Sequence, residues 1–323
     1  MSKYLKDNDG NNPPTRFCGL HFALLTNLKL IRLKLRQDKE QTMRLQKKLT
    51  WLGFCALLLT IQAFAGDRSA EFTEEFHQTY PLSADGRVDI GNINGSVHVT
   101  GWDRNEVKVD AVKSAHSKER LDEAKVRVNA TSSRVSIHTE YPERDHDWRR
   151  DNYDNPASVE YTITVPRSAR LDKIELINGG LDIKNVVGEI EATCINGRLV
   201  AEGLAGRALL STINGPLEAG FARMDNSRIE LSSVNGPLSL TLPSDAKAEL
   251  EASTVHGGIN NEFGLHVDKH QWVGRDLKGE LGGGGTRIKL NNVNGPIDIR
   301  RANDGRPLSP AKTLNDADDG DKI

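Results

Sequence analysis

Short alternating runs of apolar and polar residues recur along the chain, and most of them end near Gly, Asn or Pro. The segments 181–183 (LDI), 228–231 (RIEL) and 287–290 (RIKL) are typical, with every second residue apolar. Strict alternation indicates a β-strand with one buried face. β-branched residues, which favour strands, are frequent in these runs. The pattern therefore predicts an all-β protein.

A second pattern lies over the first, because an apolar residue followed by Asn-Gly recurs along the chain, with His replacing Asn once. The predicted turn residues are Asn94, Gly95, Asn178, Gly179, Asn196, Gly197, Asn214, Gly215, Asn235, Gly236, His256, Gly257, Asn294 and Gly295. Successive glycines are 84, 18, 18, 21, 21 and 38 residues apart, and the last interval is close to two units. Asn and Gly suit a turn because both tolerate positive φ.

Two architectures fit these repeats. In one, each Asn-Gly closes a hairpin of an antiparallel meander; in the other, each repeat is one coil of a β-solenoid, stacked in parallel on the next. The pairs before the apolar turn residue read Thr-Cys, Ser-Thr, Ser-Ser, Ser-Thr and Asn-Asn, and such columns of like residues favour the solenoid. We expect a single-stranded, parallel β-helix-like solenoid. Its Ile and Val residues should stack inside the core, and Cys194 should fill a column of small residues.

The repeats define the expected domain organisation. Residues 171–300 form the solenoid, and residues 66–170 form an N-terminal β-rich cap that contains the first repeat. Within the cap, residues 117–125 suggest a short helix, and residues 126–128, 135–138 and 159–165 read as strands. Residues 301–323 are polar and without pattern, which is typical of a disordered tail.

The N-terminus carries an export signal. Basic residues from Arg44 to Lys48 precede an apolar run that ends in Ala63-Phe64-Ala65, a small-x-small cleavage pattern. We interpret residues 43–65 as a signal peptide and residues 1–42 as a leader or a non-native extension upstream of Met43. A membrane anchor is the alternative, but the run is short for a span. The mature protein is therefore expected in the periplasm, on the cell surface or in the medium.

The net charge bears on nucleic acid binding, and the cysteine content bears on disulfide bonds. Residues 66–323 hold 32 Lys and Arg against 41 Asp and Glu, a net charge of −9. A modestly acidic surface argues against nucleic acid binding, which needs a basic footprint. Cys194 is the single cysteine after the signal, so an internal disulfide is impossible there.

The repeated Asn-Gly unit and the segment VDIGNINGSVHVTGWDRNEVKVDAVKSA, residues 88–115, resemble the DUF4097 and head-GIN families, which are adhesin-type repeat domains of exported bacterial proteins. The resemblance covers about residues 72–300 and rests on the repetition more than on any single motif. It implies a β-helix-like domain in the periplasm or on the cell surface. The families supply no catalytic residues to transfer.

Few residues suggest ligand recognition, metal binding or phosphate binding. The loop PERDHDWRRDNYDN, residues 142–155, is read either as a plain solvated loop or as a recognition loop or carboxylate cluster suited to calcium. Its candidate binding residues are Asp145, His146, Asp147, Trp148 and Tyr153. His266 and His270 lie in a loop rather than on the helix that such zinc spacing normally requires, so no metal site is predicted. The run Gly282–Gly285 lacks the Lys-Ser/Thr of a phosphate loop, and no cofactor is predicted.

These observations favour a non-catalytic envelope protein that presents one side of the solenoid to an envelope protein, a glycan or a surface. Contact with a membrane is expected only through an uncleaved signal segment. The alternative is a carbohydrate-active enzyme, a lyase or hydrolase, on the same scaffold. It would need carboxylates that converge beside aromatic residues, whereas Asp182, Glu191, Glu218 and Asp298 show no evident focus, and Trp102, Trp148 and Trp272 are the available sugar platforms.

Overall fold

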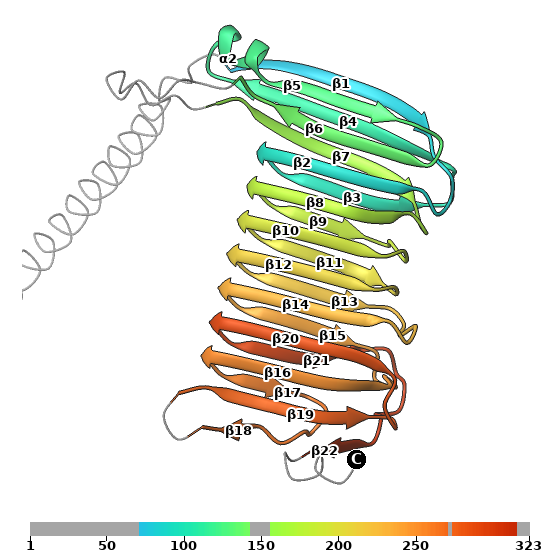
Figure 1. Ribbon diagram of the computed structural model, residues 1–323, viewed down its shortest axis with the longest axis vertical. Coiled ribbons are helices and arrows are strands. Elements are labelled where there is room, and N and C mark those ends of the chain that lie inside the picture. Colours follow the sequence, from blue (N-terminus) through green and yellow to red (C-terminus); the bar gives the residue numbers. More distant parts are fainter. Residues whose placement is uncertain (1–70, 143–155, 271–272, 315–323) are drawn as a thin grey trace, which may run out of the picture. The chain divides into compact units, whose positions relative to one another are not determined.

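The computed structural model describes residues 71–142, 156–270 and 273–314. This part of the chain forms two large β-sheets and one short helix, α2 (Lys118–Glu123), as Figure 1 shows. The prediction of an all-β protein is confirmed. Over the same residues, no helix is long and apolar enough to span a bilayer.

The two sheets are built from strands that neighbour one another in space but often not in sequence. In spatial order, sheet A contains β1 (Phe72–Pro81), β4 (Glu106–Ala115), β7 (Ser158–Pro166), β3 (Val97–Trp102), β9 (Leu181–Lys184), β11 (Leu199–Leu204), β13 (Leu217–Phe221), β15 (Leu238–Leu242), β21 (Ile297–Arg301) and β17 (Ile259–Asn261). In the same direction, sheet B contains β5 (Lys125–Ala130), β6 (Arg134–Glu140), β2 (Arg87–Asn94), β8 (Arg170–Asn178), β10 (Ile190–Asn196), β12 (Ala208–Asn214), β14 (Arg228–Asn235), β20 (Thr286–Asn294), β16 (Ala248–His256), β19 (Arg275–Leu281) and β18 (Asp268–Lys269), with β22 (Ala311–Thr313) paired to β19.

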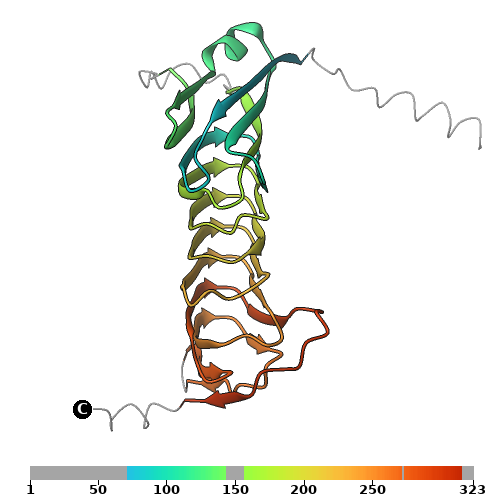
Figure 2. The ribbon, with the colours of Figure 1, turned by 90° about the vertical axis from the view of Figure 1, so that its right-hand side faces the viewer.

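Each Asn-Gly corner joins a strand of sheet B to a strand of sheet A, and we call such a pair a layer. The two strands of a layer are not paired with each other; each pairs with its equivalents in the layers above and below. In β10 and β12, Cys194 lies opposite Thr212 and Asn196 opposite Asn214, in parallel. Figure 2 shows the stacked layers from the side. The antiparallel meander is therefore excluded for the repeats.

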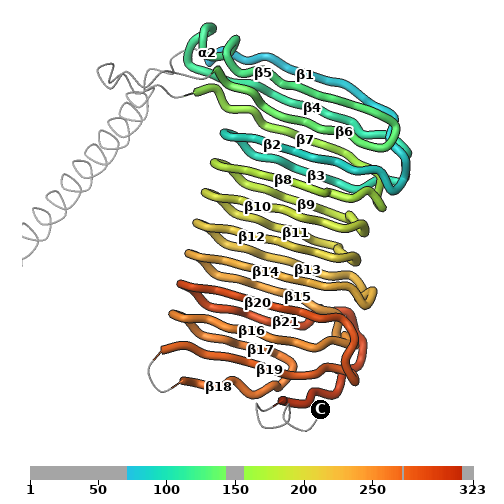
Figure 3. Tube along the Cα trace, viewed as in Figure 1, coloured from blue at the N-terminus to red at the C-terminus, as the bar shows by residue number. Residues whose placement is uncertain are grey.

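The layers do not follow one another in sequence order. In space, β20/β21 lies between β14/β15 and β16/β17, although it comes last in the chain. At the other end, β2/β3 lies between β6/β7 and β8/β9, although it comes first. Figure 3 shows both displacements by colour. The 38-residue interval between Gly257 and Gly295 thus holds β18 and β19, not the further coil that the spacing suggested.

A narrow apolar core fills the space between the sheets. Leu199, Leu217, Leu238 and Ile297 occupy one position in successive strands of sheet A and are fully buried. Sheet B contributes the column that contains Leu210 and Leu231. Because each layer adds one residue per column, core residues repeat along the sequence at the spacing of the layers.

The column nearest the corner is buried and mostly polar, and it corrects one prediction. Asn92, Leu176, Cys194, Thr212, Ser233, Asn292 and Thr254 point inward, whereas the Ile and Val residues that follow them point outward. The expectation that Ile and Val stack in the core is wrong. Some of the inward polar residues donate to corner carbonyls: Thr254 Oγ1 donates to Gly295 O at 3.1 Å, and Asn292 Nδ2 donates to Gly236 O at 2.9 Å.

The corner glycines are required by close stacking of the backbone. A Cβ on Gly215 would overlap the carbonyl oxygen of Gly197 in the layer beside it, and the same holds along the whole series of corners. Gly215 also has φ of 142°, which disfavours side chains. Among the described residues no corner Asn has positive φ, so Asn serves a different purpose from the one predicted.

Irregular elements close both ends of the stack. At the N-terminal end, α2 begins at Ser117, which caps it, and this helix lies where residues 117–125 predicted one. At the other end, antiparallel β19 covers β16. Residues 302–314, expected to be disordered, include β22, and Asp304 accepts a hydrogen bond from the Ser244 amide. That part of the expected tail is therefore ordered.

Replacing a corner glycine should destabilise the stack. We expect Gly215→Ala to lower the free energy of unfolding by about 2–4 kcal/mol, because it combines a strained φ with a clash against backbone. Gly220→Ala in β13 is the control: its Cβ would find open space, and stability should stay equal or rise by up to about 1 kcal/mol. Urea unfolding followed by circular dichroism measures both. Equal effects of the two substitutions would contradict the stacking argument.

The inward polar column yields a second prediction. Thr212 Oγ1 is buried without a hydrogen-bond partner, whereas Thr254 Oγ1 donates to Gly295 O. Thr212→Val should therefore leave stability unchanged or raise it by up to about 1 kcal/mol, while Thr254→Val should lower it by about 1–2 kcal/mol. The two variants share the same chemistry and burial, so each controls the other in a thermal melt. A larger loss in Thr212→Val would show that the corner carbonyls do not depend on this column.

Candidate functional site

The outer face of sheet B carries four columns of side chains, each with its own chemistry. In β14, Arg228, Glu230, Ser232 and Val234 point outward in that order. Parallel strands in register repeat these positions in every layer, about 4.8 Å apart. Moving toward the corner, the face thus changes from charged to hydroxyl-bearing to apolar.

The column of Ile and Val residues is the most unusual of the four, and we call it the apolar column. In spatial order it contains Ile93, Ile177, Ile195, Ile213, Val234, Val293 and Val255. Its members are between 38% and 46% exposed, apart from Ile195, which is half-buried. A continuous apolar strip of this kind marks an interaction surface more often than scattered apolar residues do.

The column beside it is polar and uncharged over five consecutive layers. It consists of Thr193, Ser211, Ser232, Asn291 and Ser253, all of them half-buried. Ser253 Oγ donates to Asn291 Oδ1 at 3.4 Å. These side chains form a hydrogen-bonding border along one side of the apolar column.

The corner asparagines form a border on the other side. Their side-chain amides donate to one another through successive layers, from Asn178 to Asn94, Asn196 to Asn178, Asn214 to Asn196, Asn235 to Asn214 and Asn294 to Asn235, at 2.9–3.0 Å. His256 occupies the corner after Asn294. The structure therefore brings the six predicted turn asparagines together in one amide ladder, which holds the corners in register.

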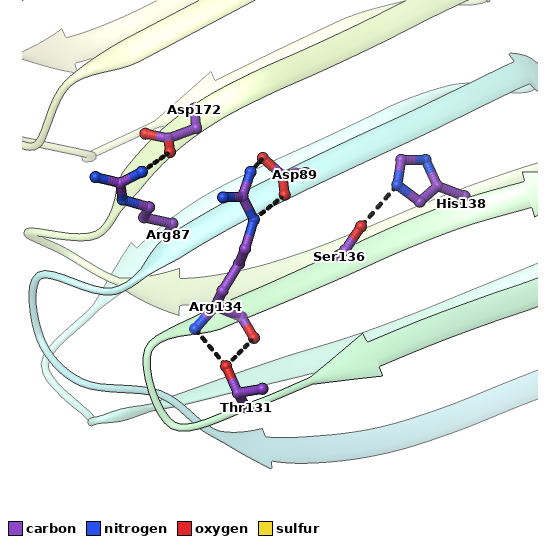
Figure 4. A network of polar contacts seen from close by, with 7 residues as sticks. All are labelled: Arg87, Asp89, Thr131, Arg134, Ser136, His138 and Asp172. Atoms are coloured by element: carbon purple, nitrogen blue, oxygen red, sulfur yellow. Dashed lines mark hydrogen bonds and ion pairs between the residues drawn. The ribbon is translucent and has the colours of Figure 1, made fainter.

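Most charged side chains in these columns are paired with opposite charges on the same face. Figure 4 shows such pairs on β2, β6 and β8. Arg134 donates to both carboxylate oxygens of Asp89, at 2.6 and 2.9 Å, and Arg87 lies 3.4 Å from Asp172. The hydrogen bonds that Arg134 donates to Asp89 raise the pKa of Arg134. Because arginines in successive layers would repel one another, these carboxylates stabilise the column. This strip presents paired charges rather than a cationic surface.

The surroundings of Cys194 make its thiol unreactive. Its side chain is fully buried, and the Sγ thiol donates weakly to Gly179 O at 3.4 Å. Burial raises the pKa of Cys194 to about 11, so the thiol stays protonated at neutral pH. Cys194 therefore fills the inward column, as the small-residue pattern predicted.

Three of the four carboxylates that the sequence did not place together lie in one column. Asp182, Glu218 and Asp298 share one column on the outer face of sheet A, two layers apart each time, whereas Glu191 lies on sheet B. Asp182 is clamped by Arg198 Nη2 at 2.9 Å and by His98 Nδ1 at 2.9 Å. Register across layers, which sequence spacing alone does not reveal, produces this alignment.

The remaining predicted site residues are those of the loop 142–155 and the two histidines around β18. Asp145, His146, Asp147, Trp148 and Tyr153 lie outside the described residues, between the end of β6 and the start of β7. His266 and His270 flank β18, where His270 contacts Asp276. In the described segments, no group of three or more His, Cys, Asp or Glu side chains is arranged to hold a metal ion.

Comparison with known proteins yields distant likenesses to solved structures. No family model and no curated protein matches the chain. A putative cell adhesion protein from Clostridium sporogenes has 12% identity, covers 71% of this chain and all of its own length, and has a TM-score of 0.43. A putative adhesin from Bacteroides fragilis has 13% identity, 71% and 97% coverage and a TM-score of 0.33. A putative lipid binding protein from Parabacteroides distasonis has 7% identity, 71% and 97% coverage and a TM-score of 0.24. At these TM-scores the likenesses carry no argument about function.

Proposed function

We propose that this chain is an exported, non-catalytic protein of the bacterial envelope that binds a partner protein through the outer face of sheet B. The observation that carries the proposal is the apolar column, in which seven layers of the described structure present Ile or Val to solvent. Seven layers at about 4.8 Å make a strip roughly 30 Å long. Exposing such a strip is unfavourable unless another surface covers it.

The surroundings of the apolar column suit a protein interface. An apolar centre with polar borders is the common arrangement of protein–protein contacts. Here the borders are the Ser/Thr/Asn column on one side and the corner amide ladder on the other. Such a face fits a flat partner surface with an apolar strip between hydrogen-bonding groups. The charged columns lie farther out, where paired charges contribute little to affinity.

The finer fold assignment belongs to the same proposal. We interpret the repeats as a β-solenoid, because their strands are parallel, in register and joined across corners. Residues 66–170 supply its cap and first repeat, and residues 171–300 its further repeats. Membership of the DUF4097 or head-GIN families, and an adhesive role, are supported by the repeated Asn-Gly unit. Export rests on the predicted signal peptide at residues 43–65, and we expect the protein in the periplasm, on the cell surface or in the medium.

A carbohydrate-active enzyme remains the second candidate, favoured by the column that contains Asp182, Glu218 and Asp298. Two features weigh against it. Asp182 is committed to Arg198 and His98. Trp102, the one sugar platform among the described residues, donates its Nε1 to Glu106 O and lies against the Arg104 guanidinium, 5.0 Å from the ring centre.

Charging the centre of the apolar column should abolish binding. We expect the double variant Ile213→Lys, Val234→Lys to reduce co-sedimentation of the purified chain with bacterial envelope fractions by about tenfold or more, since two ammonium groups would be buried in an apolar contact. Val112→Lys is the matched control, because Val112 on β4 is 40% exposed, against 39% for both column residues. It should sediment like the unmodified chain.

The readout is the fraction of protein in the pellet over a range of envelope concentrations, with circular dichroism to show that all variants fold. If the double variant sediments as well as Val112→Lys, the apolar column is not the binding surface. If the unmodified chain does not sediment at all, the proposal of an envelope partner fails.

A further inference from the structure

A groove crosses the outer face of sheet A, on the opposite side from the apolar column. Its volume is about 310 Å³, at the lower end of the range for small-ligand sites. It runs across β11, β13 and β15. The side chains that matter for recognition are Val200, Glu202, Glu218, Ser239, Thr241 and Arg300.

The groove exists because Gly220 has no side chain where neighbouring layers have one. Gly220 lies opposite Thr241, and Thr241 lies opposite Arg300. Its φ is not positive, and a Cβ placed on it would meet only Ala201 O, at 4.0 Å. The fold therefore does not require glycine at this position. A strand-interior glycine without a backbone reason often marks a place where a ligand approaches the backbone closely.

A β-bulge lies on the other side of the groove. The register between β11 and β13 shifts between Ala201 and Leu204, and Gly203 in the bulge has φ of 70°. Bulges change the direction of the side chains around them. Glu202, directly before Gly203, lies at the wall of the groove, where its carboxylate is 3.5 Å from Lys184 Nζ.

Most polar groups of the groove are uncommitted. Within the described part of the chain, Glu218, Ser239 and Thr241 make no side-chain hydrogen bond or ion pair with another residue. The guanidinium of Arg300 has one loose pair, at 3.7 Å from Asp298. Asp182, in the same column as Glu218, is by contrast clamped by Arg198 and His98. The groove thus offers free acceptors and donors side by side.

We propose that this groove binds a neutral saccharide, one or two sugar units of a glycan chain. A sugar hydroxyl both donates and accepts, so it can donate to Glu202 or Glu218 and accept from Ser239, Thr241 or Arg300. The Val200 side chain offers the ring an apolar surface, and the absence of a side chain at Gly220 leaves room for it. Two carboxylates against one guanidinium disfavour an anionic ligand. This site is independent of the apolar column.

Titration calorimetry on the full-length chain tests the proposal with three probes: cellohexaose, chitohexaose and the anionic hexamer of galacturonate. We expect at least one neutral hexasaccharide to bind and the galacturonate hexamer to bind more weakly. Gly220→Val should weaken the neutral probe by about tenfold or more, because the side chain fills the groove without backbone strain. Glu218→Gln and Thr241→Val should each weaken it by a smaller factor.

Gly180→Val is the matched control, since a Cβ there also meets only ordinary contacts, 3.6 Å from the Arg198 side chain, and Gly180 lies outside the groove. It should bind like the unmodified chain, as should the double variant Ile213→Lys, Val234→Lys. No binding of either neutral hexasaccharide, stronger binding of galacturonate, or unchanged binding after both Gly220→Val and Glu218→Gln would each overturn the proposal. These outcomes leave the partner-protein proposal untouched, because that one is read from envelope sedimentation.

Discussion

The structure depends on the close approach of backbone to backbone at the corners. Gly179, Gly197 and Gly215 stack so closely that a Cβ on one would overlap the carbonyl of the next. The amides of the neighbouring asparagines hydrogen-bond in the same direction, layer after layer. Together these contacts fix the register of every strand that leaves a corner. Since register in a sheet with one buried face decides which side chains are inside, the corner determines both the core and the outer surface.

The buried, mostly polar column nearest the corner follows from the same constraint. Stacked corners bring carbonyl oxygens into the interior, where an unpaired polar group is costly. Short polar side chains such as Thr254 and Asn292 reach these oxygens, and an aliphatic side chain cannot donate to them. Because strand residues alternate between faces, placing these polar residues inside forces the next residue, Ile or Val, to the outside. The apolar column therefore lies on the outside because its neighbours nearest the corner point inward, and it becomes available as a binding surface.

Much of this architecture could be read from the sequence, and the failures have physical reasons. Alternation and Asn-Gly spacing predicted the strands, the corner residues and the buried position of Cys194. The direction of the Ile and Val column was predicted wrongly, because the rule that apolar residues face inward ignores hydrogen-bond demand at the corner. The order of the layers was missed because the pairing of β20 with β14 and β16 depends on contacts far apart in sequence. The bulge beside Gly220 needs the register of two strands to become visible.

A structure made of repeated layers also changes which residues are informative about function. Residues that conform to a column, such as Asn214 or Leu217, are explained by stacking. Residues that depart from their column without a structural reason need another explanation. Gly220 departs from a column that holds Thr241 and Arg300, and the backbone does not require it. Asp182 departs as a buried acid, but Arg198 and His98 account for it within the fold. By this criterion the groove at Gly220, rather than the more conspicuous charged columns, is the place on sheet A where a residue is better explained by binding than by folding.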